Sequence, residues 1–199
     1  AGHCWPQDNG IAPCGGPLPY QNCGYDGPGD LLRHLYGELA PPALDIVHPS
    51  LRLFDQRPFD ESGSVGLHSF GRVYVPAACA TRRCKLHVSL HGCGTPFALM
   101  GLLATTLSFN KHAETNDIVV LWPQKAAEVL TPGATWEERQ GCWDGYGQTG
   151  AEYDTQSGAQ MQAVRKMIEA LAGTNMMSVH AAEPASKTMQ MLRTPRPDP

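Results

Sequence analysis

The pattern of apolar and polar positions predicts three main strands. Residues 71–76 (Gly-Arg-Val-Tyr-Val-Pro) are rich in strand-favouring side chains, and residues 86–91 (Leu-His-Val-Ser-Leu-His) alternate between apolar and polar. Residues 118–123 form a nearly continuous apolar run. Alternation is typical of a half-buried strand, whereas a continuous run indicates a strand covered on both faces. A shorter strand is expected at Leu51–Phe54.

Helical spacing marks three other segments, at residues 30–39, 97–116 and 156–172. Asp30 is the expected N-cap of the first helix, which we expect to stop before Pro41. The last helix carries one apolar stripe, made of Met161, Val164, Ile168 and Leu171. Residues 4–30 and 124–153 lack either periodicity and are predicted to be loops.

The order of these elements predicts one α/β domain. Strands that alternate with helices are typical of a mostly parallel sheet with flanking helices. We assign residues 1–173 to this domain. Residues 174–199 contain few aromatic residues and end in three spaced prolines, so we expect a disordered tail.

Composition and charge exclude several classes of function. The chain has 199 residues, a net charge of −4 and 42% hydrophobic residues. No basic stripe is present to replace the counterions of a nucleic acid, so we expect no nucleic-acid partner. No apolar run approaches the roughly 20 residues of a membrane-spanning helix, so we expect no membrane partner.

Cysteine usage predicts a disulfide framework and not a metal site. The seven cysteines lie at positions 4, 14, 23, 79, 84, 93 and 142, without the paired CxxC motifs of structural zinc sites. Cys14–Cys23 and Cys79–Cys84 are the expected local pairs, and an odd number leaves at least one thiol free. Such a framework indicates a secreted, extracellular protein. No signal peptide is recognised at Ala1, so a secreted form would have its leader removed or outside this sequence.

Three segments together resemble one family of esterases. The first is Ala1–Pro6 with Asn22–Asp26, and the second runs from Val73-Tyr74-Val75-Pro76 to His91-Gly92-Cys93-Gly94. The third is Gly141-Cys142-Trp143-Asp144-Gly145-Tyr146-Gly147. In this order they resemble the carboxyl-terminal half of circularly permuted extracellular poly(3-hydroxybutyrate) depolymerases, over residues 1 to about 173.

The resemblance implies a Ser–Asp–His hydrolase that cleaves polyester chains without a metal or an organic cofactor. It implies His3 as general acid/base, the backbone N–H of Cys93 as one oxyanion donor, and Trp143, Tyr146 and Gly94 as substrate contacts. Asp144 is then a turn-stabilising carboxylate, and a Cys93–Cys142 disulfide is expected to link the two motifs. The third motif departs from the family pattern, because Gly145 and Tyr146 replace two tryptophans.

The serine and the aspartate of such a triad are not recognised in this sequence. The nearest segment to the Gly-x-Ser-x-Gly elbow is Ser62–Gly66, which lacks the first glycine, a preceding strand and a following helix. We therefore expect a partial α/β-hydrolase fold without the half that carries the nucleophile. Residues 86–90 would then form a bare strand edge, which predicts either aggregation or a second chain bearing the other half.

Other interpretations compete with this one. His91 is expected to be a structural histidine that forms hydrogen bonds within its loop, and a reactive Cys93 nucleophile would require a nearby base that the sequence does not show. A feruloyl or acetylxylan esterase would share the oxyanion turn. A catalytically inactive polyester- or carbohydrate-binding fragment would explain the unrecognised serine.

Overall fold

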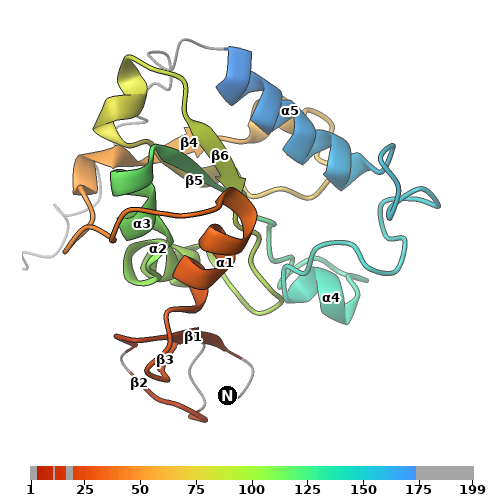
Figure 1. Ribbon diagram of the computed structural model, residues 1–199. Helices are drawn as coiled ribbons and strands as arrows, with labels where there is room; N and C mark the ends of the chain where they lie inside the picture. The colour runs from red at the N-terminus through yellow and green to blue at the C-terminus, as the bar shows by residue number, and fades with distance from the viewer. Residues whose placement is uncertain (1–3, 11, 17–19, 174–199) are drawn as a thin grey trace, which may run out of the picture.

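The computed structural model describes residues 4–10, 12–16 and 20–173 (Figure 1). His3 and the tail at 174–199 lie outside the described residues, so the predictions made for them are not tested. At the centre is a four-stranded sheet in the order β4-β5-β7-β6. Its strands are β4 (Leu51–Asp55), β5 (Phe70–Tyr74), β6 (Lys85–Val88) and β7 (Ile118–Trp122).

The prediction of a mostly parallel sheet is wrong for these strands. β4 pairs with β5 and β5 pairs with β7 in antiparallel fashion, and only β6 and β7 are parallel. The cause lies in the connections. Parallel neighbours need a long crossover, usually a helix, and helices stand only between β6 and β7. Between β4 and β5, and between β5 and β6, the chain has only short 3₁₀ turns at Arg57–Phe59 and Ala77–Ala80.

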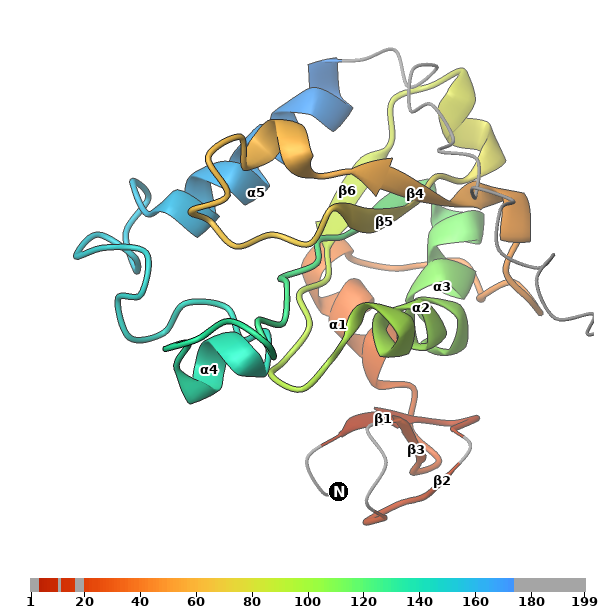
Figure 2. The same cartoon turned by 180° about the vertical axis from the view of Figure 1, so that it is seen from behind.

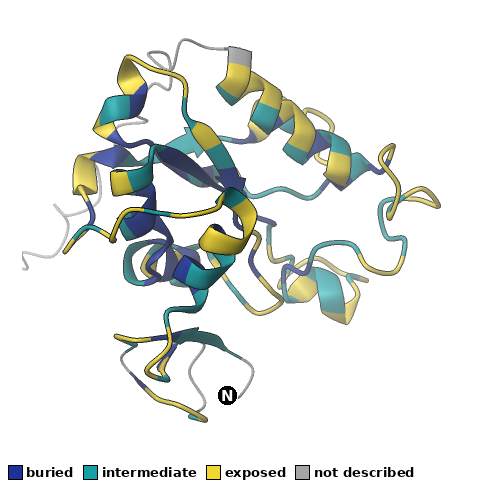
Figure 3. Ribbon diagram, viewed as in Figure 1, coloured by how far each residue is buried: buried dark blue, intermediate teal, exposed yellow. Residues whose placement is uncertain are grey.

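Strand β7 connects two hydrophobic cores, one on each face of the sheet (Figure 3). Ile118, Val120 and Trp122 face the core formed with the helices that precede β7 in the chain, whereas Val119 and Leu121 face the core on the opposite side. All five side chains are buried, which confirms the strand covered on both faces that the apolar run predicted. Trp122 is the largest fully buried side chain in the part of the chain that the structure describes.

Helix α1 (Gly27–Tyr36) begins earlier than predicted, with Asp26 as its N-cap in place of Asp30. The Asp26 carboxylate accepts a hydrogen bond from the backbone N–H of Gly29, and Pro28 fits the first turn because its missing N–H would have no helical partner there. A Cβ on Gly29 would lie 2.1 Å from Asp26 Oδ2, so only glycine leaves room for this cap. The helix ends at Tyr36, because Gly37 adopts a φ of 84°.

The predicted helix at 97–116 is two helices, α2 (Phe97–Thr106) and α3 (Phe109–Asn116). They pack with α1 on one face of the sheet, and α5 (Ala159–Gly173) covers the other face (Figures 1 and 2). The long loop between β7 and α5 contains a further short helix, α4 (Trp136–Arg139). A capping box formed by Thr135 and Glu138 stabilises its first turn. None of the helices in the described residues is long and apolar enough to cross a membrane.

Residues 4–30 were predicted to be a loop, and this is wrong in part. They contain a small parallel sheet of β1 (Trp5–Gln7), β2 (Ala12–Pro13) and β3 (Tyr20–Asn22), in the order β1-β3-β2. The strands are too short to show periodicity in the sequence. A disulfide joins Cys14 and Cys23, which directly follow β2 and β3, as expected from their spacing. A 3₁₀ turn at His48–Ser50 precedes β4, which confirms the expected strand at Leu51–Phe54.

Strand β6 lies at one end of the four-stranded sheet. Along β6 the peptide groups point alternately to the two sides of the strand. The Lys85 N–H donates to the segment at the start of β7, whereas the peptide groups of Leu86 and Val88 point to the opposite side, away from β7. On that side the Tyr36 hydroxyl donates a hydrogen bond of 2.8 Å to the Leu86 carbonyl. Among the described residues no strand pairs with this edge.

Candidate functional site

The candidate site begins where the two parallel strands end. After β6 the chain passes through His91 into the turn Gly92-Cys93-Gly94, and after β7 it passes through Gln124 and Lys125. Because β6 and β7 are parallel, their carboxyl ends lie at the same edge of the sheet. This is the edge at which α/β folds usually bind ligands.

His91 connects these two segments. Its Nδ1 lies 2.9 Å from the Gly92 carbonyl oxygen, which can only accept, and its Nε2 lies 3.0 Å from the Lys125 backbone N–H, which can only donate. Nδ1 therefore carries the proton and Nε2 the lone pair. Burial lowers the pKa of His91 below its ordinary value, the bond to Gly92 opposes this in part, and the charge of Lys125 lowers it further. The neutral ring has the structural role expected of it.

Two buried glutamines support the same region. Gln124 donates from Nε2 to the carbonyl of Thr95, 3.1 Å away, just beyond the turn. The side chain of Gln56 forms two hydrogen bonds with the backbone of Gln124, each 2.9 Å long. Its Oε1 accepts from the Gln124 N–H, and its Nε2 donates to the Gln124 carbonyl. Both glutamines are almost fully buried. The end of β7 is thus fixed through its own backbone, and it holds the turn after β6 in place.

The turn itself is fastened at two further points. Cys93 forms a disulfide with Cys142, and the Gly94 N–H donates a 2.8 Å hydrogen bond to the Gln140 carbonyl. Gly94 has a φ of 70°, a conformation that glycine adopts without strain. The Cys93 N–H forms no hydrogen bond with any residue that the structure describes. Cys93 thus presents an unpaired backbone donor on an exposed residue, and so does the preceding Gly92.

The loop after Cys142 is organised by one carboxylate. Asp144 accepts hydrogen bonds from the backbone N–H groups of Tyr146, Gly147, Gln148 and Thr149 and from the Thr149 hydroxyl. Partial burial alone would raise the pKa of Asp144, but the bonds from Thr149 and the other donors outweigh it and lower the pKa to about 2. The carboxylate is occupied by its own loop, in agreement with the expected turn-stabilising role.

The two aromatic residues of this loop differ in exposure. Trp143 is half-buried, and its ring lies 5.5 Å from the His91 ring, centroid to centroid. Its indole N–H is buried without an acceptor among the described residues. Tyr146 is 79% exposed. Trp143 therefore lies directly against the structure that holds the turn, and Tyr146 projects from the loop into solvent.

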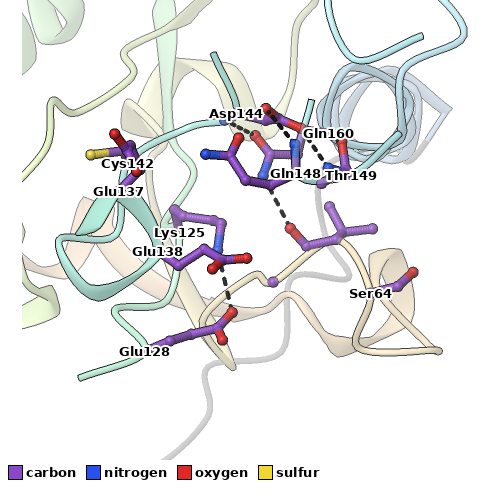
Figure 4. A pocket seen from close by; sticks show the side chains of 12 residues that line it. Ser64, Lys125, Glu128, Glu137, Glu138, Cys142, Asp144, Gln148, Thr149 and Gln160 are labelled. Atoms are coloured by element: carbon purple, nitrogen blue, oxygen red, sulfur yellow. Dashed lines mark hydrogen bonds and ion pairs between the residues drawn. The ribbon is translucent and has the colours of Figure 1, made fainter. Parts of the chain in front are cut away.

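A polar pocket lies beside Cys142 (Figure 4). Lys125 lines it and is only 5% exposed, and its ammonium pairs with Glu128 at 3.8 Å. Glu137, Glu138 and Gln148 line the pocket as well. This lining is polar, so the pocket offers no apolar surface to a polyester chain. No group of three or more His, Cys, Asp and Glu residues in the described part of the chain could hold a metal ion.

The structure brings together the expected site residues that it describes. Cys93, Gly94 and Trp143 meet around His91, and Tyr146 lies at the rim of the same loop. The disulfides Cys14–Cys23, Cys79–Cys84 and Cys93–Cys142 are the expected pairs, and Cys4 is a free thiol. Sequence reasoning missed Gln56, Gln124 and Gln140, because their contacts join segments far apart in the chain and leave no local signal.

No protein-family model matches the chain. The chain is 34% identical over 154 residues to a polyhydroxybutyrate depolymerase of Talaromyces funiculosus, covering 73% of this chain and 45% of that protein. It is 34% identical over 157 residues to a poly(3-hydroxybutyrate) depolymerase of Delftia acidovorans, covering 76% of this chain and 30% of that protein. The chain's homologues are polyhydroxybutyrate depolymerases.

The solved structures agree with the sequence relatives. A Ser-to-Ala variant of a PHB depolymerase, complexed with an R3HB trimer, matches with a TM-score of 0.71 and 31% identity over 84% of this chain and 56% of that one. The PHB depolymerase from Penicillium funiculosum matches with a TM-score of 0.69 and 31% identity over the same shares. The chain spans less than half the length of the two curated relatives. The shared fold therefore covers nearly all of this chain and only part of each depolymerase.

Proposed function

We propose that this chain provides part of the active site of an esterase that hydrolyses poly(3-hydroxybutyrate) or a related aliphatic polyester. The observation that carries the proposal is the structural match, over 84% of the chain, to a PHB depolymerase complexed with an R3HB trimer. The proposed reaction is acyl transfer to a serine followed by hydrolysis, which needs a base, an orienting carboxylate and two N–H donors for the oxyanion.

The Cys93 N–H is the proposed oxyanion donor of this chain. It is unpaired, it lies at the carboxyl end of the parallel strands, and the disulfide to Cys142 holds its residue in place. The neighbouring Gly94 N–H is already bonded to Gln140, so it is not free to serve an oxyanion. A fixed donor stabilises the developing charge without reorganising during the reaction, which is how oxyanion holes work.

The remaining catalytic groups follow from the resemblance. His3 is the proposed general acid/base. No Gly-x-Ser-x-Gly segment occurs in the 199 residues, and the curated relatives are more than twice as long as the matched region. We therefore assign the serine and the aspartate to residues that are not in this sequence and that would be joined to it in the permuted order of the family. The open edge of β6 supports this assignment.

Substrate contacts and localisation complete the proposal. Trp143 offers an apolar ring beside the turn, and Tyr146 extends that surface at the rim. Gly94 would contact the chain of the substrate through its Cα, because its N–H is occupied. Three disulfides are consistent with an extracellular enzyme, where such bonds persist and where an insoluble polymer has to be cleaved.

The test compares the 199-residue chain with the product of the complete reading frame that contains it. We expect the complete product to hydrolyse 4-nitrophenyl butyrate and a poly(3-hydroxybutyrate) film, and a serine-directed phosphonate to block both activities. His3→Ala should lower kcat at least about a thousandfold, as loss of the base does in serine hydrolases. His34→Ala, on the exposed face of α1, is the matched control and should leave kcat unchanged.

Two results would overturn the proposal in different ways. Binding to the film without hydrolysis of either substrate, in both preparations, would identify an inactive binding module. Phosphonate-sensitive hydrolysis by the 199-residue chain alone would place the nucleophile within these residues and reject the assignment of the serine to another segment.

A further inference from the structure

One peptide group carries both a fixed acceptor and the proposed oxyanion donor. The carbonyl of Gly92 and the N–H of Cys93 belong to the same planar unit, in which the two bonds point in opposite directions. His91 Nδ1 lies 2.9 Å from the oxygen of this unit. The direction of the Cys93 N–H is therefore tied to the hydrogen bond that His91 donates at the opposite edge of the same peptide plane.

We propose that His91 is a positioning residue, which orients the Cys93 N–H toward the substrate by holding the carbonyl of the same peptide. The inference rests on the proposed function, because it takes the Cys93 N–H as the oxyanion donor. His91 touches no reacting atom in this arrangement. It differs from a histidine that merely fills the core, because its effect is directed at one backbone donor.

The peptide needs such a restraint because it begins at Gly92, and a second glycine, Gly94, follows Cys93. A Cβ on Gly92 would meet nothing within 4 Å, so packing does not limit rotation there, and Gly94 adopts a φ of 70°. The disulfide of Cys93 fixes the side-chain end of that residue, and the Gly94–Gln140 bond fixes the following peptide. Within the described residues, the bond from His91 is the hydrogen bond that fixes the plane between Gly92 and Cys93.

His91 is itself held by rigid neighbours. Its Nε2 accepts the backbone N–H of Lys125 at 3.0 Å, and the Gln124 amide nitrogen lies 3.2 Å from the same atom. The residue is 6% exposed, and its ring lies against Trp143. A hydrogen bond to the carbonyl also polarises the peptide and strengthens its N–H as a donor, as in hydrogen-bonded chains generally. The imidazole can thus both aim and strengthen the donor.

The arrangement requires the neutral ring. A proton on Nε2 would face the Lys125 N–H, and it would add a buried positive charge close to the Lys125 ammonium, which is the charged group acting on this ring. Burial, the opposing bond to Gly92 and this charge together lower the pKa of His91. The Cys93 N–H should keep its orientation as pH falls through the ordinary range of histidine, and lose it only as pH falls through the lower pKa of His91.

The test is nuclear magnetic resonance on the ¹⁵N-labelled 199-residue chain, with two variants. His91→Asn keeps an N–H donor close to the position of Nδ1, whereas His91→Gln moves its amide to the position of Nε2 and removes that donor. We expect the wild-type ring to be protonated on Nδ1. The Cys93 amide resonance should shift in His91→Gln and stay near its wild-type position in His91→Asn.

An acid titration of the wild-type chain gives a second reading that needs no variant. The Cys93 amide and the His91 ring should then titrate with one midpoint. Thermal melts show which variants are folded. If His91→Gln is unfolded, the titration of the wild-type chain tests the inference instead. A ring protonated on Nε2, or a Cys93 amide that ignores both the loss of the donor and the titration of the ring, would overturn the inference.

Hydrolysis provides a separate measurement in the complete reading frame. His91→Gln should lower kcat by about 10²–10³-fold with KM little changed, the usual effect of losing an oxyanion donor, and His91→Asn should restore most of it. The resonance of Cys93 does not depend on turnover. A protein that fails to hydrolyse esters would therefore reject the proposed function while the positioning of Cys93 by His91 could still be confirmed or rejected.

Discussion

Asp26 caps the start of α1 through one hydrogen bond and joins it to α3 through two more. Its Oδ2 lies 2.6 Å from Nε2 of His112, which is 1% exposed, and its Oδ1 accepts the Ser108 hydroxyl at 2.5 Å and the Gly29 N–H at 3.0 Å. Burial alone would raise the pKa of Asp26, but the bonds from Ser108, His112 and Gly29 outweigh it, and the pKa is lowered. This residue fixes α1, and with it Tyr36, against the rest of the fold.

Replacing the Asp26 carboxylate should therefore cost stability in a pH-dependent way. We expect Asp26→Asn to lower the free energy of unfolding at pH 7 by about 1.5–3 kcal/mol, the usual contribution of hydrogen bonds to a charged group. Because the folded pKa is lowered, this contribution is present above the unfolded pKa of about 4 and is lost as pH falls through the folded value. Urea unfolding at pH 7 and at pH 3 measures both effects.

The exposed Asp154 is the matched control, since Asp154→Asn removes the same charge from the surface. It should change the free energy of unfolding by less than about 0.5 kcal/mol. Equal losses for the two variants, or a loss for Asp26→Asn that grows in acid, would contradict the described junction.

At the scale of elements, the open edge of β6 depends on a contact from α1. The Tyr36 hydroxyl satisfies the Leu86 carbonyl, and the Tyr36 ring meets that of His87 edge-on at 6.3 Å. Tyr36→Phe should lower the free energy of unfolding by about 0.5–1.5 kcal/mol, because a partly buried carbonyl loses its donor. Chemical denaturation measures the change. Tyr146→Phe, at a residue that is 79% exposed, should be nearly neutral, and a comparable loss there would count against the edge contact.

The Cys93–Cys142 bond links the turn after β6 to the loop after α4. It closes a segment with a sequence separation of 49, for which the chain-entropy model gives about 4 kcal/mol. A Cys93→Ala/Cys142→Ala variant should lose about that stability, and the Gly94 amide should exchange faster because the bond to Gln140 is no longer held. Hydrogen exchange measures this. A Cys14→Ala/Cys23→Ala variant is the control and should leave the Gly94 amide protected. Unchanged protection of Gly94 in the Cys93→Ala/Cys142→Ala variant would show that the turn needs no disulfide.

The local pattern was enough to find the elements, but not the pairing of the strands. The uninterrupted apolar run at 118–123 identified β7, since a strand covered on both faces needs both sets of side chains. Strand direction depends on connections and long-range contacts, so the antiparallel pairs of β4, β5 and β7 were missed. The start of α1 was missed because Gly-Pro-Gly suggests a turn, although proline suits a first helical turn.

The whole molecule shows why only part of the candidate site could be predicted. The turn at 92–94 and the loop at 141–147 were recognised through motifs, and the disulfide between them followed from the resemblance. The contacts that hold the turn come from Gln124, Lys125 and Gln140, which are remote in sequence and carry no motif. His3 lies outside the described residues, so its proximity to Cys93 is a prediction.

The arrangement of the molecule also bears on the proposed partner of β6. Two hydrophobic cores cover the faces of the sheet, whereas the edge at Leu86 and Val88 is met by the Tyr36 hydroxyl and by no strand of the described residues. An unpaired edge is a site for strand pairing. It is consistent with the proposal that the nucleophile-bearing part of the esterase continues the sheet from β6.

The most direct test of the account is the binding of an (R)-3-hydroxybutyrate trimer to the ¹⁵N-labelled chain, followed residue by residue in solution. The account predicts saturable shifts of the Cys93 amide and the Trp143 indole, because the trimer should lie across the turn at the carboxyl ends of β6 and β7. Saturable shifts confined to other surfaces, or no binding at all, would contradict it.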